Sequence, residues 1–138
     1  MAIAYLGTEP KKILGTFLQF DLTFNSGAAF SVANSRTIFL TLFAVVIAGF
    51  ILYIGKKLIS PAWAIALGLV LGGIFGNLAD RIFRTPSALQ GAVVDWIKLP
   101  HWPTFNLADT SIVLGAGLII ILSSRNIKPI SGPNDRTL

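Results

Sequence analysis

Three long apolar runs dominate the pattern of hydrophobic and polar positions along the chain. They occupy residues 37–55, 58–79 and 110–124, and charged or polar residues bound each run. A helix needs roughly 20 apolar residues to cross a bilayer, and the third run reaches that length only if its helix begins near Pro103. We therefore predict an all-α membrane protein with three transmembrane helices, at residues 37–55, 58–82 and 104–124.

The segments outside these runs carry a β-type pattern. Residues 13–24 alternate between apolar and polar positions, and residues 91–102 contain the apolar stretch AVVDWIKL. Both patterns favour extended strands. We expect a small extracytoplasmic β platform, in which residues 1–31 are a strand segment on the membrane surface. Residues 1–125 would then form a single membrane-embedded domain, and the tail at 126–138 is expected to be disordered.

The second apolar run carries glycines at a spacing of four residues: Gly68, Gly72 and Gly76. This spacing places small residues on one helix face, where a neighbouring helix can approach closely. A further step of four reaches Asp80, on roughly the same face. The carboxylate of Asp80 is therefore expected to point into the helix bundle and away from lipid.

Composition supports the membrane assignment and removes several classes of function. The 138 residues are 54% hydrophobic and 12% charged, and the mean hydropathy is +0.74, which is too apolar for a soluble surface. There is no cysteine, so disulfides and thiolate nucleophiles are excluded. The eleven Lys and Arg residues are scattered beside the apolar runs, which suits anchoring to lipid headgroups and predicts no nucleic-acid partner.

Three of the six acidic residues lie at or between the ends of the second and third runs: Asp80, Asp95 and Asp109. Ionised groups near hydrocarbon are costly, which makes these acids functional candidates. Two carboxylates brought together at a membrane edge are the parts of an aspartyl hydrolase. The only histidine, His101, fits an interfacial loop. Carboxylates with one histidine make a weak metal site, so no metal or other cofactor is expected.

The polar residues beside these acids each have a structural interpretation as well as a functional one. Asn77, Asp80 and Arg81 share one helical face, either as an Asp–Arg pair that satisfies itself at a helix end or as a face that orients a loop or substrate. Asn106 and Asp109 also share a face. Helix capping explains one of them but not both, which favours catalysis for Asp109.

Three further positions remain open on the same grounds. An Asp inside an apolar strand is unfavourable, so Asp95 is either a solvent-facing strand residue or a catalytic one. Asn25, in the segment that precedes Gly27, either opens the first spanning helix with a turn or binds a substrate backbone through its amide. Arg84 begins the loop after the second run and is expected to be solvated.

Four motifs, at 25–31 (NSGAAFS), 72–81 (GGIFGNLADR), 93–96 (VVDW) and 105–109 (FNLAD), resemble those of the bacterial lipoprotein signal peptidase family, also called signal peptidase II. The resemblance implies an aspartyl endopeptidase of the cytoplasmic membrane. Its substrate would be a diacylglyceryl-modified prolipoprotein, which it would cleave just before the lipidated cysteine. Lipid-modified prolipoprotein and membrane lipid are thus the expected partners.

The resemblance also implies roles for individual residues. Asp95 and Asp109 correspond to the catalytic dyad, on the extracytoplasmic side of the membrane. The positions that support the site or contact substrate are Asn25, Gly27, Asn77, Asp80, Arg81, Asn106 and Ala108. The family has four transmembrane helices where three are counted here, so one alternative is an inactive truncated homologue. A second alternative is a small ion-coupled transporter, which would place acids near mid-span.

Overall fold

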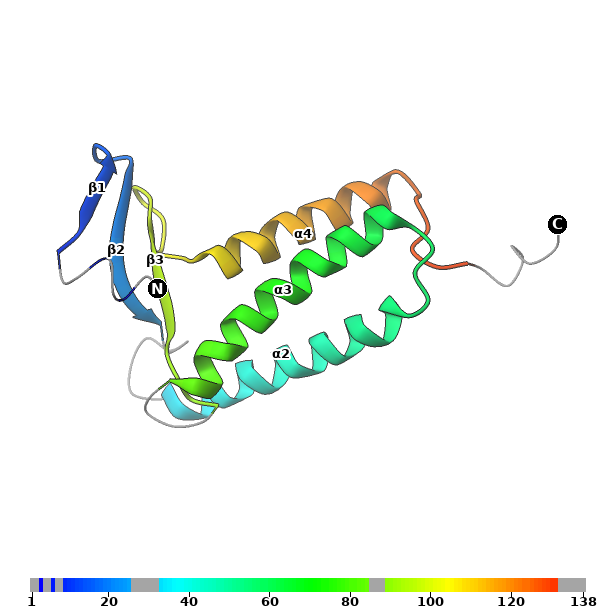
Figure 1. The fold of residues 1–138 in the computed structure, drawn as a ribbon, viewed down its shortest axis with the longest axis horizontal. Helices are drawn as coiled ribbons and strands as arrows, with labels where there is room; N and C mark the ends of the chain where they lie inside the picture. Colours follow the sequence, from blue (N-terminus) through cyan, green and yellow to red (C-terminus); the bar gives the residue numbers. More distant parts are fainter. Residues whose placement is uncertain (1–2, 4–5, 7–8, 26–32, 85–88, 132–138) are drawn as a thin grey trace. The chain divides into compact units, whose positions relative to one another are not determined.

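Three long helices and a three-stranded sheet make up the described part of the chain (Figure 1). The computed structural model describes residues 3, 6, 9–25, 33–84 and 89–131, without the side chains of residues 33–36. The strands are β1 (Lys11–Leu14), β2 (Leu18–Asn25) and β3 (Val93–Lys98), and the helices are α2 (Ala33–Gly55), α3 (Pro61–Phe83) and α4 (Leu107–Ser124). This result confirms a mostly helical fold with a small sheet.

The chain divides into two compact units, which are described separately. The sheet unit comprises Met1–Thr41 and Asn77–Leu107, and the helical unit comprises Leu42–Gly76 and Ala108–Leu138. Helices α2 and α3 therefore each contribute one end to the sheet unit and the remainder to the helical unit.

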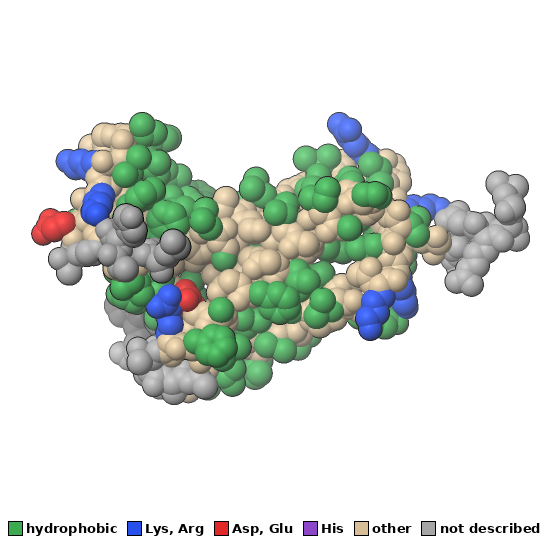
Figure 2. All heavy atoms as spheres, in the orientation of Figure 1, with side chains coloured by type: hydrophobic (Ala, Val, Ile, Leu, Met, Phe, Trp, Pro, Cys, Tyr) green, Lys and Arg blue, Asp and Glu red, His purple; other side chains and the backbone are tan. Residues whose placement is uncertain are grey.

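All three helices are long and apolar enough to cross a membrane. The apolar segments are Thr37–Gly55, Pro61–Phe83 and Leu107–Ser124, of 19, 23 and 18 residues. At 1.5 Å per residue they cover roughly 27–35 Å, which matches a hydrocarbon core of about 30 Å. Their large apolar side chains face outward, as at Phe39 and Ile120, and Figure 2 shows such side chains spread along the helices. A multi-pass membrane protein is thus confirmed.

The sheet begins with a hairpin where one continuous strand was predicted. Strands β1 and β2 are antiparallel, with Lys11 opposite Phe20 and Lys12 opposite Gln19. Between them Gly15 has φ +58°, a left-handed conformation that glycine adopts without steric penalty. The backbone N–H of Phe17 donates to the carbonyl of Leu14 at 3.0 Å and closes the turn.

Strand β3 completes the sheet beside β2, in the order β1-β2-β3. It runs antiparallel to β2, with Asn25 opposite Val93 and Thr23 opposite Asp95. Residues 93–95 are buried, and the ring of Trp96 meets Phe20 edge-on at 5.0 Å between centroids. Strand β3 is thus buried at its start, where the candidate acid lies, although the paired end of β2 is exposed.

Gly91, shortly before β3, lies close against the C-terminal end of α3. The N–H of Gly91 donates to the carbonyl of Arg81 at 3.0 Å, and a Cβ at Gly91 would collide with the backbone oxygens of Asp80 and Arg84. The buried hydroxyl of Thr41, on α2, donates to the carbonyl of Leu89 at 3.0 Å. These contacts hold the start of β3 against the ends of both helices.

Helix α4 begins later than predicted, at Leu107 in place of residue 104. Phe105 is the reason, because its backbone pairs with β3. Its carbonyl accepts from the N–H groups of Trp96 and Ile97 at 3.0 and 2.8 Å, and its own N–H donates to Ile97 at 3.0 Å. A residue bonded to a strand in this way cannot also lie inside a helix.

In the helical unit, α3 and α4 are in contact through small residues, but only partly through those predicted. A Cβ at Gly73 would collide with the carbonyl of Ala108 and lie 2.5 Å from Ile112, and one at Gly76 would lie 3.0 Å from Ala108. At Gly68 and Gly72, by contrast, a Cβ would meet nothing within 4 Å among the described residues. The close-approach face therefore passes through Gly73 and Gly76.

The start of the tail, predicted to be disordered, packs against the helical unit. Asn126 has φ +56°, and the N–H of Ile127 donates to the carbonyl of Leu122 at 3.0 Å, as at a helix end with a left-handed residue. The indole N–H of Trp63 donates to the carbonyl of Ile127 at 2.7 Å. Residues 132–138 lie outside the described part.

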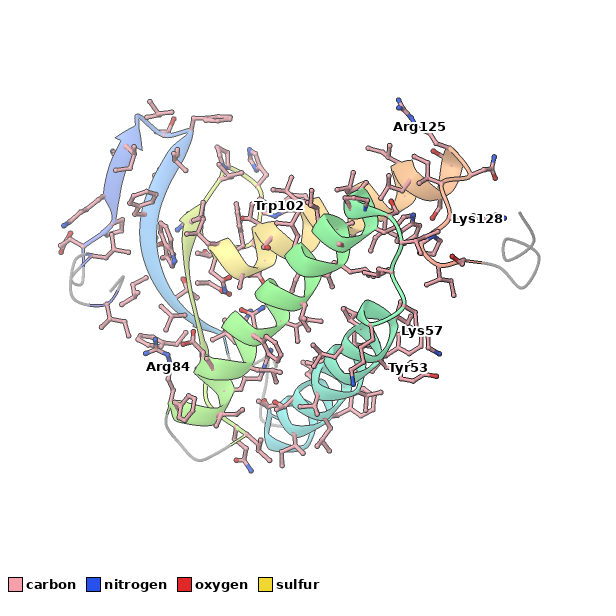
Figure 3. The ribbon with its side chains drawn as sticks, turned by 45° about the vertical axis from the view of Figure 1, so that its right-hand side comes forward. Tyr53, Lys57, Arg84, Trp102, Arg125 and Lys128 are labelled. Atoms are coloured by element: carbon pink, nitrogen blue, oxygen red, sulfur yellow. The ribbon has the colours of Figure 1, made fainter. Side chains whose placement is uncertain are left out.

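Basic side chains gather at one end of the helical unit. The ammonium of Lys57 donates to the hydroxyl of Tyr53 at 2.8 Å and lies 4.3 Å from the centre of its ring. Figure 3 shows this pair at the end of α2, with Arg125 and Lys128 after the last turn of α4. Cations and a tyrosine at span ends suit the headgroup region of a bilayer.

Candidate functional site

The carboxylate of Asp95 is the centre of the candidate site. It is only 2% exposed and, among the described residues, it is the one charged residue that is fully buried. The amide of Asn25 donates to its Oδ2 at 2.9 Å, and the amide of Asn106 donates to its Oδ1 at 2.7 Å. Such donors compensate for the removal of a charge from water. The structure therefore excludes the first of the two interpretations of Asp95, a strand residue that faces solvent.

A second bond extends this arrangement to helix α3. The amide of Asn106, itself buried, also donates to Oδ1 of Asn77 at 3.2 Å. Asn25 ends β2, Asp95 is in β3, Asn77 is in α3, and Asn106 immediately precedes α4. We call these four residues the Asp95 cluster. Its members come from four separate stretches of the chain, so the fold assembles them.

Asp80 ties α3 to the strand that carries Asp95. Its Oδ2 accepts the backbone N–H of Val94 at 3.0 Å, and its Oδ1 pairs with Nε of Arg84 at 2.6 Å. The sequence predicted a solvated Arg84. The structure instead pairs it with Asp80, because the backbone N–H of Arg84 donates to the carbonyl of Asp80 at 3.1 Å and this helical spacing places the two side chains on one face.

The remaining predicted residues lie in other places. Asp109 is in the first turn of α4, where a negative charge interacts favourably with the helix dipole. It is partly buried and follows Asn106 by three residues. Ala108 and Asp109 belong to the helical unit, whereas the Asp95 cluster belongs to the sheet unit. Gly27 lies outside the described residues.

The family follows from comparison with known proteins. Residues 1–125 match the family described as signal peptidase (SPase) II. The chain belongs to the signal peptidase II family. It is 49% identical over 115 residues to the lipoprotein signal peptidase of Mycobacterium tuberculosis. The matched stretch covers 83% of this chain and 57% of that protein. The corresponding enzyme of Streptomyces coelicolor is 50% identical over 121 residues, or 88% of this chain and 59% of that protein. The chain thus spans less than two thirds of the length of these relatives.

Two solved structures share this signal peptidase II fold. One, a bacterial membrane enzyme determined by the in meso method at 2.3 Å, superposes with a TM-score of 0.75 at 26% identity, over 95% of this chain and 82% of that one. The other, determined in the same way at 1.9 Å, has a TM-score of 0.72 at 27% identity, over 88% and 79%. The architecture predicted from the hydrophobic pattern is therefore confirmed.

Two details of this signal peptidase II chain were not deduced from its motifs. Arg84 stands outside all four motifs, yet it contacts Asp80, and only the spacing of four residues could have indicated it. The backbone N–H of Val94, one residue before Asp95, was also missed because main-chain donors leave no mark in a sequence. His101 lies in an exposed turn with φ +58°, in agreement with the predicted loop.

Proposed function

We propose that this chain is an aspartic endopeptidase that cleaves diacylglyceryl-modified prolipoproteins before their lipidated cysteine. The observation that carries the proposal is the buried carboxylate of Asp95, which accepts bonds from the amides of Asn25 and Asn106. A carboxylate is kept in such surroundings only with fixed partners, and carboxylates of this kind are candidates for proton transfer. Membership of the signal peptidase II family supports the reaction and the substrate.

Asp109 is the proposed second carboxylate of the dyad. Two carboxylates that share a site do not both ionise cheaply, so the pair keeps one proton and titrates as a unit. The ionised member takes a proton from a water molecule, whose oxygen attacks the scissile carbonyl. The protonated member polarises that carbonyl and then gives its proton to the leaving amine as the C–N bond breaks. No step uses a cofactor.

The neighbouring residues are proposed to position the dyad. Asn106 connects Asp95 to Asn77, and Asp80 holds β3 through the N–H of Val94. Because β3 carries Asp95, a displacement of this strand would displace the carboxylate. The family motifs support further contacts to substrate or site from Gly27, Arg81 and Ala108.

The orientation proposed is in the cytoplasmic membrane with the dyad on the outer side. Two crossings, by α2 and α3, separate strands β1 and β2 from the connection between α3 and α4, so these segments lie on the same side. Both strand segments and both catalytic candidates therefore share one side. Outward placement suits a substrate that is exported before its signal peptide is removed.

The dyad is tested by changing each carboxylate to an amide. Asp95→Asn and Asp109→Asn are each expected to lower the cleavage rate by at least about a hundredfold, because an amide cannot take up a water proton. Cleavage of a purified diacylglyceryl prolipoprotein is followed by gel shift, and membrane insertion is measured alongside. Glu9→Gln is the matched control, since Glu9 is exposed. Wild-type cleavage by either dyad variant would refute the assignment.

A further inference from the structure

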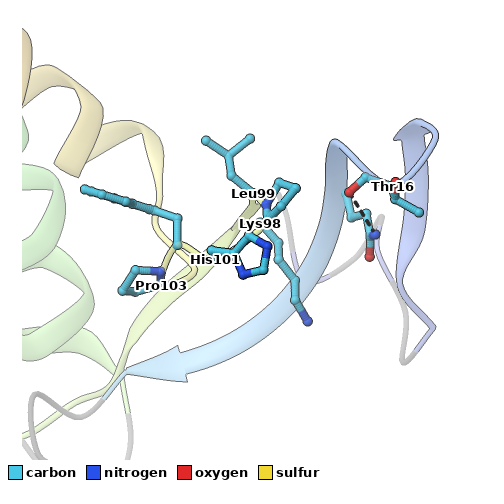
Figure 4. Close-up of a pocket in the computed structure, with 8 residues that line it drawn as sticks. Thr16, Lys98, Leu99, His101 and Pro103 are labelled. Carbon is cyan, nitrogen blue, oxygen red and sulfur yellow. Dashed lines mark hydrogen bonds between the residues drawn. The ribbon is translucent and has the colours of Figure 1, made fainter.

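The sheet unit contains an open pocket that is distinct from the Asp95 cluster. It has a volume of about 450 Å³ and lies between the β1–β2 turn and the loop after β3 (Figure 4). Its lining consists of Thr16, Gln19, Lys98, Leu99, Pro100, His101, Trp102 and Pro103. None of these residues belongs to the cluster or to the family motifs above, so the proposed peptidase chemistry leaves the pocket unexplained.

The lining of this pocket is amphipathic. Its polar members, Thr16, Gln19, Lys98 and His101, offer hydroxyl, amide, ammonium and imidazole groups, while Trp102 and the neighbouring Leu and Pro side chains supply apolar surface. Donors and cations beside an aromatic ring suit a ligand that has an anionic part next to an apolar part. A free inorganic anion would use only the polar members.

The sheet register extends the positive charge of this pocket. Gln19 stands opposite Lys12 on β1 and opposite Lys98 on β3. Residues directly opposite in an antiparallel sheet project from the same face, so two ammonium groups flank the amide of Gln19. Asp21 offsets part of this charge, because its Oδ2 pairs with Nζ of Lys98 at 2.6 Å. Even with Asp21 included, the row of Lys12, Gln19 and Lys98 carries a net positive charge.

The pocket is also close to the membrane along the chain. Trp102 is 66% exposed and comes five residues before Leu107, the first residue of an apolar span. Five residues reach at most about 17 Å even when extended. An exposed tryptophan at this distance from a span end is typical of the headgroup layer, and lysines in that layer attract anionic lipids.

We propose that this pocket binds the phosphate-containing headgroup of an anionic phospholipid from the surrounding leaflet. Lys98 is the central cation, Gln19 contributes amide donors, and Trp102 packs against the glycerol and upper acyl region. The bound lipid would hold the sheet unit at the membrane surface. This inference does not depend on the peptidase activity.

Lipid binding is measured on the purified full chain in detergent by native mass spectrometry. Phosphatidylglycerol is titrated in one arm, phosphatidylcholine with the same acyl chains in a second, and inorganic phosphate competes in a third. The wild type is expected to prefer phosphatidylglycerol, and Lys98→Gln is expected to weaken its binding about fivefold. Phosphatidylcholine binding should not change. If millimolar phosphate displaced the lipid completely, the site would recognise a free anion and the proposal would be wrong.

Two variants separate lipid recognition from loss of folding. Asp21→Asn and Lys98→Gln break the same ion pair, but Asp21→Asn raises the local positive charge, so it should strengthen phosphatidylglycerol binding while Lys98→Gln weakens it. A folding defect would instead weaken phosphatidylglycerol binding in both variants. Lys12→Gln should weaken binding more than Lys11→Gln, since Lys11 stands opposite Phe20 and projects from the other face.

Other results would overturn the proposal. Equal binding of both lipids by wild type and Lys98→Gln would show that the pocket does not recognise headgroup charge. If Lys98→Gln left lipid binding unchanged and raised the KM for a prolipoprotein peptide, the pocket would serve the substrate instead. If the chain did not cleave prolipoprotein but still preferred phosphatidylglycerol, the peptidase proposal would be wrong and the lipid-binding proposal would be supported.

Discussion

Asn25 and Asn106 donate to the same carboxylate from different surroundings. Asn106 is 6% exposed, whereas Asn25 lies at the exposed end of β2. Water can replace a lost donor at the exposed position but has little access to the buried one. The two asparagines therefore offer a direct comparison of what burial adds to a hydrogen bond with a charged group.

Asn106→Ala is expected to destabilise the protein by about 2–3 kcal/mol, and Asn25→Ala by less than about 1 kcal/mol, because a buried bond to a charged group is worth more than one that water can replace. Thermal unfolding of both variants in one detergent measures the difference. Equal losses would show that burial of the Asp95 carboxylate does not set the energy of these bonds.

A similar comparison applies to the two partners in the pair between Asp80 and Arg84. Asp80→Ala removes the acceptor for the buried N–H of Val94 as well as the ion pair, and should cost about 2 kcal/mol. Arg84→Ala removes a part-buried ion pair but leaves the acceptor for Val94, and should cost about 1 kcal/mol or less. Unfolding midpoints test this order. A larger loss for Arg84→Ala would mean that Asp80 does not stabilise β3.

At this scale, sequence reasoning found the residue types but not all their partners. Asn25, Asn77, Asp95 and Asn106 were all identified from motifs, and the structure brings them together. The contact of Asp80 with Arg84 was not predicted, because Arg84 follows the predicted helix end at residue 82, whereas the helical hydrogen-bond pattern continues to its N–H. Partner choice depends on where a helix stops, which a hydrophobic pattern defines only within a few residues.

At the scale of elements, the contact between α3 and α4 depends on which glycine faces the neighbour. The spacing of Gly68, Gly72 and Gly76 predicted a continuous groove, but only Gly76 of these contacts α4. Gly73, one residue out of that series, makes the closest approach. A repeat of four drifts around a helix with 3.6 residues per turn, so spacing alone does not identify the face.

Gly73→Ala is therefore expected to destabilise the helical unit by about 1–3 kcal/mol through overpacking against Ala108 and Ile112. Gly72→Ala is the adjacent control and should be neutral or slightly stabilising, because its Cβ enters open space and alanine favours helix. Unfolding in detergent measures both. A neutral Gly73→Ala would place the close contact elsewhere on α3.

For the strands, the sequence pattern predicted extended chain but neither the hairpin nor the strand order. The alternation at residues 13–24 correctly indicated extended chain, and the stretch around Asp95 correctly indicated a strand. The hairpin was missed because a single Gly15 reverses the chain within an otherwise continuous pattern. Strand order was not predictable either, since pairing of β2 with β3 joins segments on either side of two helices.

For the whole molecule, the three spans determine which segments share a side of the membrane. Glu9 and Lys56 are separated by one crossing, so they should lie on opposite sides. The chain has no cysteine, which allows single cysteines at these two exposed positions. We expect a membrane-impermeant maleimide to label one variant in intact cells and the other only after permeabilisation. Labelling of both in intact cells would contradict the assignment of α2 as a span.

The pairing of β2 with β3 has a consequence for the timing of biosynthesis. Asn25 and the acid that it contacts are 70 positions apart, and the two membrane helices α2 and α3 are made between them. At 5–20 residues per second, the ribosome needs about 4–14 seconds to cover that interval. During this time β2 has an unpaired edge and Asn25 has no carboxylate to bind. A nascent chain halted after α3 would thus be inserted in the membrane yet contain no assembled cluster, and the cluster could form only after Asn106 has been made.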